Sequence, residues 1–225
     1  MPFILVETAL NLIHYNNFLF DLDGTLVDSF GDIKLSLENS YQAVLQKRVT
    51  LSRSLIGPPL NEMIENLTPE LTMESKQAIV KEFRNHYDNS TYELTNEMEG
   101  AADFLTTLFD QGKQLFVVTN KSYTPTLRIL KKLGLNMFKD VVSPDKFEGE
   151  HYTKAELIKY LIKTYFLDLR KTVMLGDTRH DIISARANSI DSISISSGYD
   201  HFENLKKEKP TYIVDNIIQL QSKLS

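Results

Sequence analysis

Short runs of apolar residues recur along most of this chain, and a helical pattern follows most of them. Continuous apolar runs of this kind are typical of parallel strands that are buried on both faces of a sheet. The runs are NFLFDLD (17–23), QLFVVTN (114–120), DVVS (140–143), TVMLGD (172–177), SISIS (192–196) and TYIVDN (211–216). Helices are expected at 100–111, 125–133, 154–165 and 181–188, with Gly112 and Gly134 at helix ends. The sequence therefore predicts an α/β fold with a doubly wound parallel sheet.

The segment between the first two runs has no strand-like pattern. Ile33, Leu37 and Tyr41 form one helical stripe, and Ile79 and Phe83 belong to another. The turn LIGPPL (55–60) separates them. We therefore predict a core made of residues 1–29 and 97–225, with an all-α cap of residues 30–96 inserted after the first core strand.

Composition limits the classes of function. A length of 225 residues fits one α/β unit with a small additional domain. The net charge of −5, without a long basic block, argues against a nucleic-acid partner. The absence of cysteine excludes disulfides and thiol catalysis. The apolar residues 2–6 lack a preceding basic region, so we expect neither a signal peptide nor a membrane span. A cytoplasmic monomer or weak homodimer is expected.

Polar side chains gather where the predicted strands end. Ligands of open parallel sheets bind beyond the carboxyl ends of the strands, so these side chains should share one rim. They are Asp21, Asp23, Thr119, Asn120, Asp177 and Asp181, together with Lys154, which opens the helix after the run at 140–143.

A rim of carboxylates without cysteine or a histidine cluster favours a hard cation, and Mg²⁺ fits best. Two unit charges about 4 Å apart interact by roughly 4 kcal/mol at an effective dielectric constant near 20. That repulsion would oppose the attack of a carboxylate on a phosphate dianion, which is why a metal ion and Lys154 are both expected. Cations of this kind act on the oxygens of a transferring phosphoryl group.

Four parts of the sequence resemble the four motifs of the haloacid dehalogenase-like hydrolase superfamily. They are FDLDGTLVDS (20–29) at the end of the first apolar run, Thr119, Lys154 and GDTRHD (176–181). The resemblance covers nearly the whole chain. The helical insert resembles the small cap of the phosphoglycolate phosphatase-like subfamily. IGPPL (56–60) and the ending GYDHFENL…KPTYIVDNIIQL strengthen that likeness.

The resemblance implies a covalent mechanism. Asp21 would attack phosphorus and become an aspartyl phosphate. Asp23 would protonate the leaving alcohol and then activate water. Thr119 and the backbone amide of Asn120 would bind phosphate oxygens. Gly24 would allow a sharp turn beneath the phosphate.

The resemblance also implies the metal site. The carboxylates of Asp21 and Asp177 and the main-chain carbonyl of Asp23 would hold Mg²⁺. Lys154 would neutralise the nucleophile and the phosphate, and Asp181 would orient water or Lys154. The expected function is Mg²⁺-dependent hydrolysis of a small phosphorylated metabolite, with phosphoglycolate or a nucleoside monophosphate as the substrate.

Several alternatives stay open. A sugar-phosphate mutase would share all four motifs, and a non-catalytic module would keep the fold. Asp23 argues against a dehalogenase, and a cap segment (49–74) without lysine argues against a phosphonate hydrolase. Lys146 is the alternative candidate for the lysine that neutralises the nucleophile and the phosphate. Arg53 could contact substrate or form a surface salt bridge, and His180 is expected to be exposed.

Overall fold

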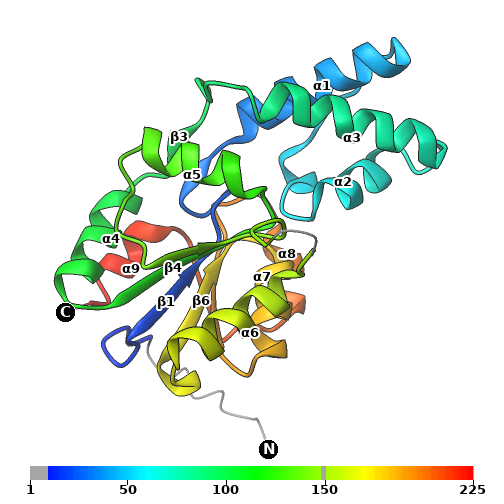
Figure 1. Cartoon of the computed structure of the whole chain (residues 1–225). Helices are drawn as coiled ribbons and strands as arrows, with labels where there is room; N and C mark the ends of the chain where they lie inside the picture. The colour runs from blue at the N-terminus through cyan, green and yellow to red at the C-terminus, as the bar shows by residue number, and fades with distance from the viewer. Residues whose placement is uncertain (1–9, 148–150, 225) are drawn as a thin grey trace, which may run out of the picture.

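A computed structural model describes residues 10–147 and 151–224. Its main feature is a six-stranded parallel sheet in the order β5-β4-β1-β6-β7-β8 (Figure 1). The strands are β1 (Asn17–Phe20), β4 (Gln114–Val118), β5 (Asp140–Val142), β6 (Thr172–Gly176), β7 (Asp191–Ile195) and β8 (Tyr212–Val214). Each of them overlaps one of the six apolar runs. The predicted α/β fold is confirmed.

Helices cover both faces of the sheet, because alternate side chains of each strand point to opposite faces. Phe18 and Phe20 of β1 belong to one core cluster, whereas Leu19 belongs to the other. The first cluster includes side chains of α4, α5 and α9, and the second includes side chains of α6 and α7. Their bounds are α4 (Ala101–Asp110), α5 (Tyr123–Lys132), α6 (Lys154–Tyr165), α7 (Arg179–Ala187), α8 (Phe202–Lys207) and α9 (Ile217–Gln221).

Residues 29–95 hold three helices, α1 (Phe30–Leu45), α2 (Leu60–Leu67) and α3 (Met73–Tyr87), and a short 3₁₀ turn, Arg53–Leu55. We call this part of the chain the helical insert. Figure 1 shows its helices grouped at one end of the molecule, beside the sheet. Ile33 and Leu37 of α1 and Ile79 and Phe83 of α3 are buried, as the two stripes predict. The proposed domain limits, 29/30 and 96/97, stay a prediction.

A two-stranded antiparallel ribbon forms the base of the insert. β2 (Val27–Asp28) pairs with β3 (Asn96–Glu97), and Val27 lies opposite Glu97. The chain therefore leaves for the helical insert and returns from it at neighbouring positions. The sequence did not indicate this ribbon.

Two further observations concern the ends of the chain. The segment LKKEKP (205–210) lies between two predicted strands, and its first three residues complete α8, a helix that the sequence did not indicate. The apolar residues 2–6, for which neither a signal peptide nor a membrane span is expected, lie outside the described residues. Among the helices of the described residues, none combines the length and apolarity needed to cross a membrane.

Candidate active site

Asp21 directly follows β1 at the edge of the sheet, where the chain turns sharply. The Asp21 amide donates to the carbonyl of Leu175, which extends the pairing of β1 with β6 by one residue. Gly24 then adopts a φ of +83°, and a Cβ added to it would lie 2.2 Å from Oδ2 of Asp177. Side chains rarely adopt that φ, and none has room there. Glycine at this position therefore allows the turn to pack against Asp177.

Lys154 joins two of the predicted carboxylates. Its Nζ lies 2.7 Å from Oδ1 of Asp21 and 2.7 Å from Oδ1 of Asp181, and all three side chains are buried. Burial alone would lower the pKa of Lys154, but the attraction of Asp181 and Asp21 outweighs it and raises the pKa. Lys154 is therefore held as an ammonium ion between the two carboxylates.

The start of α6 fixes the position of Lys154. The Thr153 hydroxyl accepts a hydrogen bond from the Glu156 amide, and the Glu156 carboxylate accepts one from the Thr153 amide. This reciprocal pair is a capping box, which stabilises the first turn of a helix. Lys154 is the first residue of α6, at the position that the sequence predicts. The rival Lys146 pairs with Asp140 instead.

Asp21, Asp177 and Asp181 form a buried acidic cluster, in which one carboxylate oxygen of each lies within 4.8 Å of the others. Asp177 accepts a hydrogen bond of 3.0 Å from the Thr25 hydroxyl and one of 2.6 Å from the Tyr199 amide. The second oxygen of Asp181 accepts from the amide and hydroxyl of Thr178. These contacts fix the carboxylates close together despite their mutual repulsion.

The pKa values of the cluster follow from burial and crowding. Burial raises the pKa of Asp21 to about 7, against the attraction of Lys154. Burial, with repulsion from Asp21 and Asp181, raises the pKa of Asp177 well above its usual range. A second cation would relieve this excess of negative charge. Buried oxygen donors at this spacing fit a hard divalent cation such as Mg²⁺.

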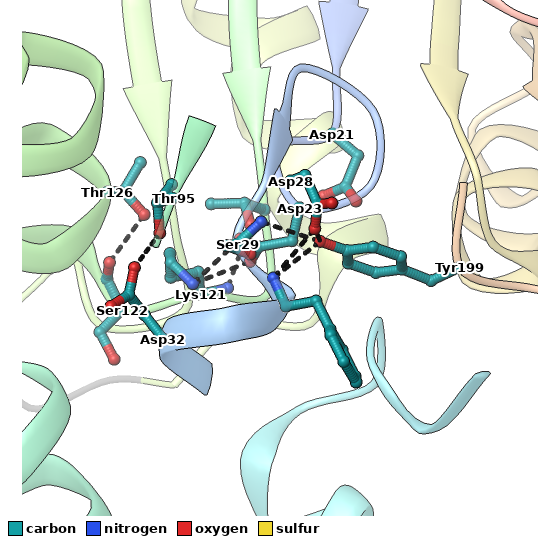
Figure 2. Close-up of polar contacts among 12 residues, drawn as sticks. Asp21, Asp23, Asp28, Ser29, Asp32, Thr95, Lys121, Ser122, Thr126 and Tyr199 are labelled. Atoms are coloured by element: carbon teal, nitrogen blue, oxygen red, sulfur yellow. Dashed lines mark hydrogen bonds and ion pairs between the residues drawn. The ribbon is translucent and has the colours of Figure 1, made fainter. Parts of the chain in front are cut away.

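Asp23 has a different environment from Asp21. One of its oxygens accepts a close hydrogen bond from the Ser29 hydroxyl, and Lys121 Nζ lies 3.0 Å from the carboxylate (Figure 2). The Lys121 side chain is only 6% exposed. Lys121 was not among the residues predicted for the site, although it directly follows Thr119 and Asn120 at a strand end.

Thr119 and Asn120 follow β4 at the same edge. Thr119 is buried, and its hydroxyl oxygen accepts a hydrogen bond of 3.1 Å from the Lys121 amide. The Asn120 side chain donates a hydrogen bond of 2.7 Å to the carbonyl of Gly57 in the helical insert. Asn120 therefore links the strand edge to the turn that the sequence identified.

A second polar cluster connects the β2 end to the loop after β7. Arg53 donates two hydrogen bonds of 2.9 Å to Asp28, so the salt-bridge interpretation of Arg53 holds. The Tyr199 hydroxyl donates to Asp28 and accepts from the amides of Ser29 and Phe30. Burial would raise the pKa of Asp28, but the hydrogen bonds from Arg53 and Tyr199 lower it. Figure 2 shows Tyr199 reaching this turn.

A cavity of about 60 Å³ lies between the strand edge and the helical insert. Asp21, Asp23, Thr119, Asn120 and Lys121 line one side of it. The insert contributes mainly apolar side chains, together with Arg84, Tyr87 and Asp88. The carboxylates therefore face a small space between the sheet edge and the insert.

The structure also corrects one expectation about histidine. His180 is only partly exposed, and its Nε2 lies 3.9 Å from a carboxylate oxygen of Glu62 in α2. Burial lowers the pKa of His180. It lies where α7 meets the helical insert, so its exposure depends on a contact that the sequence does not indicate.

The family model of the haloacid dehalogenase-like hydrolases matches residues 18–195. The chain belongs to this family. The match includes Asp21, the whole helical insert, and the strands β4 and β6, which precede Thr119 and Asp177. The predicted family is thus confirmed, and its sequence pattern extends over both sides of the cavity.

The chain is also similar to proteins whose names specify different activities. The phosphoglycolate phosphatase of Photobacterium profundum is 28% identical over 212 residues, which cover 89% of this chain and 92% of that protein. The tyrosine-protein kinase PtkA of Mycobacterium tuberculosis (strain ATCC 25618 / H37Rv) is 26% identical, covering 87% of this chain and 67% of that protein. The crystal structure of a predicted phosphatase from Clostridium acetobutylicum is 29% identical, with a TM-score of 0.83, and covers 93% of this chain and 98% of that chain.

Proposed function

We propose that this protein is a Mg²⁺-dependent phosphatase that hydrolyses a small phosphomonoester through an aspartyl phosphate on Asp21. The observation that carries the proposal is the position of Lys154, 2.7 Å from both Asp21 and Asp181. An ammonium ion held there favours the ionised form of a carboxylate that burial would otherwise neutralise. Asp21 faces the cavity in a form that can attack an electrophile.

In the first step, a carboxylate oxygen of Asp21 forms a bond to phosphorus while the bond from phosphorus to the leaving oxygen breaks. Asp23 gives its proton to that oxygen, so the alcohol leaves neutral. Asp23 lines the same cavity as Asp21 and lies two residues further along the chain. The nucleophile and the acid therefore reach the substrate from one turn.

In the second step, Asp23 takes a proton from a water molecule, and the water oxygen forms a bond to phosphorus. The bond between phosphorus and Asp21 breaks, which releases inorganic phosphate and restores the carboxylate. The hydroxyl of Thr119, which is buried and lines the cavity, would donate to a phosphate oxygen. Lys154 remains paired with Asp21 and Asp181 and balances the charge of the bound phosphate.

The acidic cluster is the proposed cation site. Asp21 and Asp177 would supply carboxylate ligands, together with the main-chain carbonyl of Asp23. When bound, Mg²⁺ supplies positive charge that lowers the repulsion between the phosphate and the carboxylates. Asp181 would act through Lys154 and Thr178, because its two oxygens already accept hydrogen bonds from them.

The position of the cavity, between the strand edge and the helical insert, supports a substrate that binds between them. Phosphoglycolate, which the Photobacterium relative's name specifies, is the first substrate to test. A nucleoside monophosphate is the second substrate to test.

The test is phosphate release from a panel of phosphomonoesters, with Mg²⁺ and again with EDTA. Wild-type protein should release phosphate from a small ester only when Mg²⁺ is present. Asp21→Asn should reduce that rate by about 10³-fold or more, because the amide is not a nucleophile. Wild-type rates in Asp21→Asn would refute the role of Asp21.

The mutase alternative predicts a different product. A mutase returns the phosphoryl group to its substrate, so it would convert one sugar phosphate into its isomer and release little phosphate. The same panel therefore distinguishes the two functions when the sugar phosphates are analysed for isomerisation as well as hydrolysis. A folded protein that does neither would favour the non-catalytic module.

A further inference from the structure

Arg53 connects the helical insert to the ribbon at its base. It begins the 3₁₀ turn of the insert, and its guanidinium donates one hydrogen bond of 2.9 Å to each of the two carboxylate oxygens of Asp28 in β2. A planar guanidinium matches a carboxylate in this geometry, which fixes the direction of the contact as well as its length. An oriented ion pair therefore attaches the insert to the ribbon.

Asp28 is itself held from the other side, by the loop after β7. The Tyr199 hydroxyl donates a hydrogen bond of 2.8 Å to Asp28 (Figure 2). Tyr199 is only 4% exposed, and its amide donates to Asp177. The guanidinium carbon of Arg53 lies 4.6 Å from the centre of the Phe30 ring and 5.4 Å from that of Tyr199. Contacts of a cation with ring faces add to the attraction of the ion pair.

The turn that begins at Arg53 continues into the wall of the cavity. The Ile56 amide donates a hydrogen bond of 3.0 Å to the Arg53 carbonyl. Ile56, Gly57 and Pro58 line the cavity, whereas Arg53 is not among the described residues that line it. The Gly57 carbonyl accepts the hydrogen bond from Asn120. Arg53 therefore supports the wall of the cavity from behind.

We propose that Arg53 is a positioning residue, whose ion pair with Asp28 holds the helical insert closed over the carboxylates before substrate binds. The inference goes beyond the proposed phosphatase function, and only its kinetic test rests on that function. An ion pair of this exposure shifts an equilibrium by about fivefold at most. Such a shift is small against the unfolding equilibrium, but it is large for a movement of the insert that breaks only a few contacts.

The first experiment measures the position of the insert without substrate or metal. The chain has no cysteine, so Met73→Cys and Lys163→Cys provide two unique sites for spin labels. Both side chains are exposed; Met73 begins α3 in the insert, and Lys163 lies in α6. Met73 is at the end of α3 far from the cavity, so a rotation of the insert should move it strongly. Double electron–electron resonance should give one distance population, and Arg53→Met should add a second.

A matched variant and a conservative variant serve as controls. Arg186→Met removes an arginine of similar exposure, 56% against 49%, that pairs with Glu208 outside the insert, so it should add no second population. Arg53→Lys keeps the charge but loses the planar pair of hydrogen bonds, so its second population should be smaller than that of Arg53→Met. KCl at about 1 M, where the Debye length is about 3 Å, should shift the protein with Arg53 towards Arg53→Met.

Kinetics with phosphoglycolate and Mg²⁺ test the consequence for the proposed reaction. Saturating substrate should close the insert again, so Arg53→Met should raise KM about threefold to fivefold and leave kcat nearly unchanged. A loss of folded protein would instead lower kcat at constant KM. Arg53→Met should have little further effect on KM in an Asp28→Asn background, because the ion pair is then already absent.

The two readouts separate this inference from the proposed function. An unchanged distance distribution in Arg53→Met would overturn the inference, whatever the protein hydrolyses. A rise in KM of about 100-fold or more would also overturn it, because Arg53 would then have to bind the substrate directly. A second population in Arg53→Met, but not in Arg186→Met, would support the inference even if the wild-type protein hydrolyses none of the esters.

Discussion

The amide side chain of Asn120 donates a hydrogen bond of 2.7 Å to the backbone carbonyl of Gly57, 63 positions earlier in the sequence. Gly57 has a φ of +121°, and a Cβ added to it would lie 2.6 Å from the methyl group of Thr178. The turn of the helical insert therefore rests on two strand ends, after β4 and after β6. This arrangement places the insert over the carboxylates.

The first prediction concerns that hydrogen bond. Asn120→Ala removes it but keeps the backbone amide that is proposed to bind phosphate. One neutral hydrogen bond is worth about 1 kcal/mol, or roughly fivefold in an equilibrium between closed and open arrangements. We expect kcat/KM for phosphoglycolate to fall about fivefold.

The control is Asn89→Ala, which removes an exposed amide that donates to the carbonyl of Asn85. Its kinetics should match the wild type. A loss of about 100-fold or more in Asn120→Ala would contradict the prediction, since the side chain would then have to act on the substrate directly.

The second prediction compares two glycines with positive φ. Gly24 has φ +83° and no room for a Cβ. Gly112 has φ +73°, and no atom of the described residues lies within 4 Å of the position where its Cβ would be. Gly112→Ala should therefore show only the cost of the backbone conformation, about 1–2 kcal/mol in the free energy of unfolding. Gly24→Ala should cost more than this, because it also displaces the Asp177 carboxylate.

Displacement of Asp177 should weaken the cation site as well. We expect Gly24→Ala to reduce Mg²⁺ affinity by about tenfold or more, measured by calorimetry, because ligand position controls affinity. Gly112→Ala should leave Mg²⁺ affinity unchanged. Similar affinities in both variants would show that Asp177 does not hold the metal ion.

The third prediction concerns pH and stability without metal. Burial raises the pKa of Asp21 to about 7 in the folded chain, above the value of about 3.9 for an unfolded aspartate. The stability that this group contributes is present in full below about pH 4 and is lost as pH rises through about 7. Asp21→Asn cannot titrate, so its free energy of unfolding should decline less between about pH 5 and pH 8.

Denaturant titrations of both proteins in EDTA at several pH values measure this difference, which has an upper limit of about 1.4 kcal/mol per pH unit for one proton. Mg²⁺ should raise the wild-type Tm more at about pH 8 than at about pH 5, because protons compete with the metal ion for the carboxylates. An equal Mg²⁺ effect at both pH values would count against this account of the cluster.

The fourth prediction separates two partners of Asp28. Arg53 is about half exposed, so Arg53→Met should change the free energy of unfolding by at most about 1 kcal/mol. Tyr199→Phe removes the hydroxyl that accepts from the buried amide of Ser29. We expect it to cost about 1–3 kcal/mol, because an unpaired buried donor remains. Urea unfolding measures the free energy of unfolding of both variants. A larger loss in Arg53→Met than in Tyr199→Phe would contradict the prediction.

The sheet could be predicted from the sequence because each strand lies in an apolar run that is buried between helices. The ribbon of β2 and β3 could not, because two residues per strand carry no periodicity. Its pairing depends on Val27 and Glu97, which the whole helical insert separates in the sequence. The short helix α8 was missed for a similar reason, since its six residues form fewer than two turns.

The candidate site shows the same division. The meeting of Asp21, Lys154, Asp177 and Asp181 was predictable, because parallel strands end at one edge and Lys154 starts a capped helix. Side-chain partners were not predictable. The backbone amide of Asn120 is predicted to bind phosphate, but the sequence did not indicate that its side chain donates to Gly57. The pairing of Lys121 with Asp23 spans 98 positions. Such partners depend on packing between distant segments.

The ribbon at the base of the helical insert also bears on how enzymes of this architecture diversify. Because Asp28 is paired with Asn96, the stretch of residues 29–95 begins and ends at neighbouring positions on the ribbon. Recombination could exchange this stretch for one of different length and leave the register of the six-stranded sheet intact. The hydrolytic groups that follow β1 and β6 would be inherited unchanged, while the surface that selects the metabolite would be free to vary.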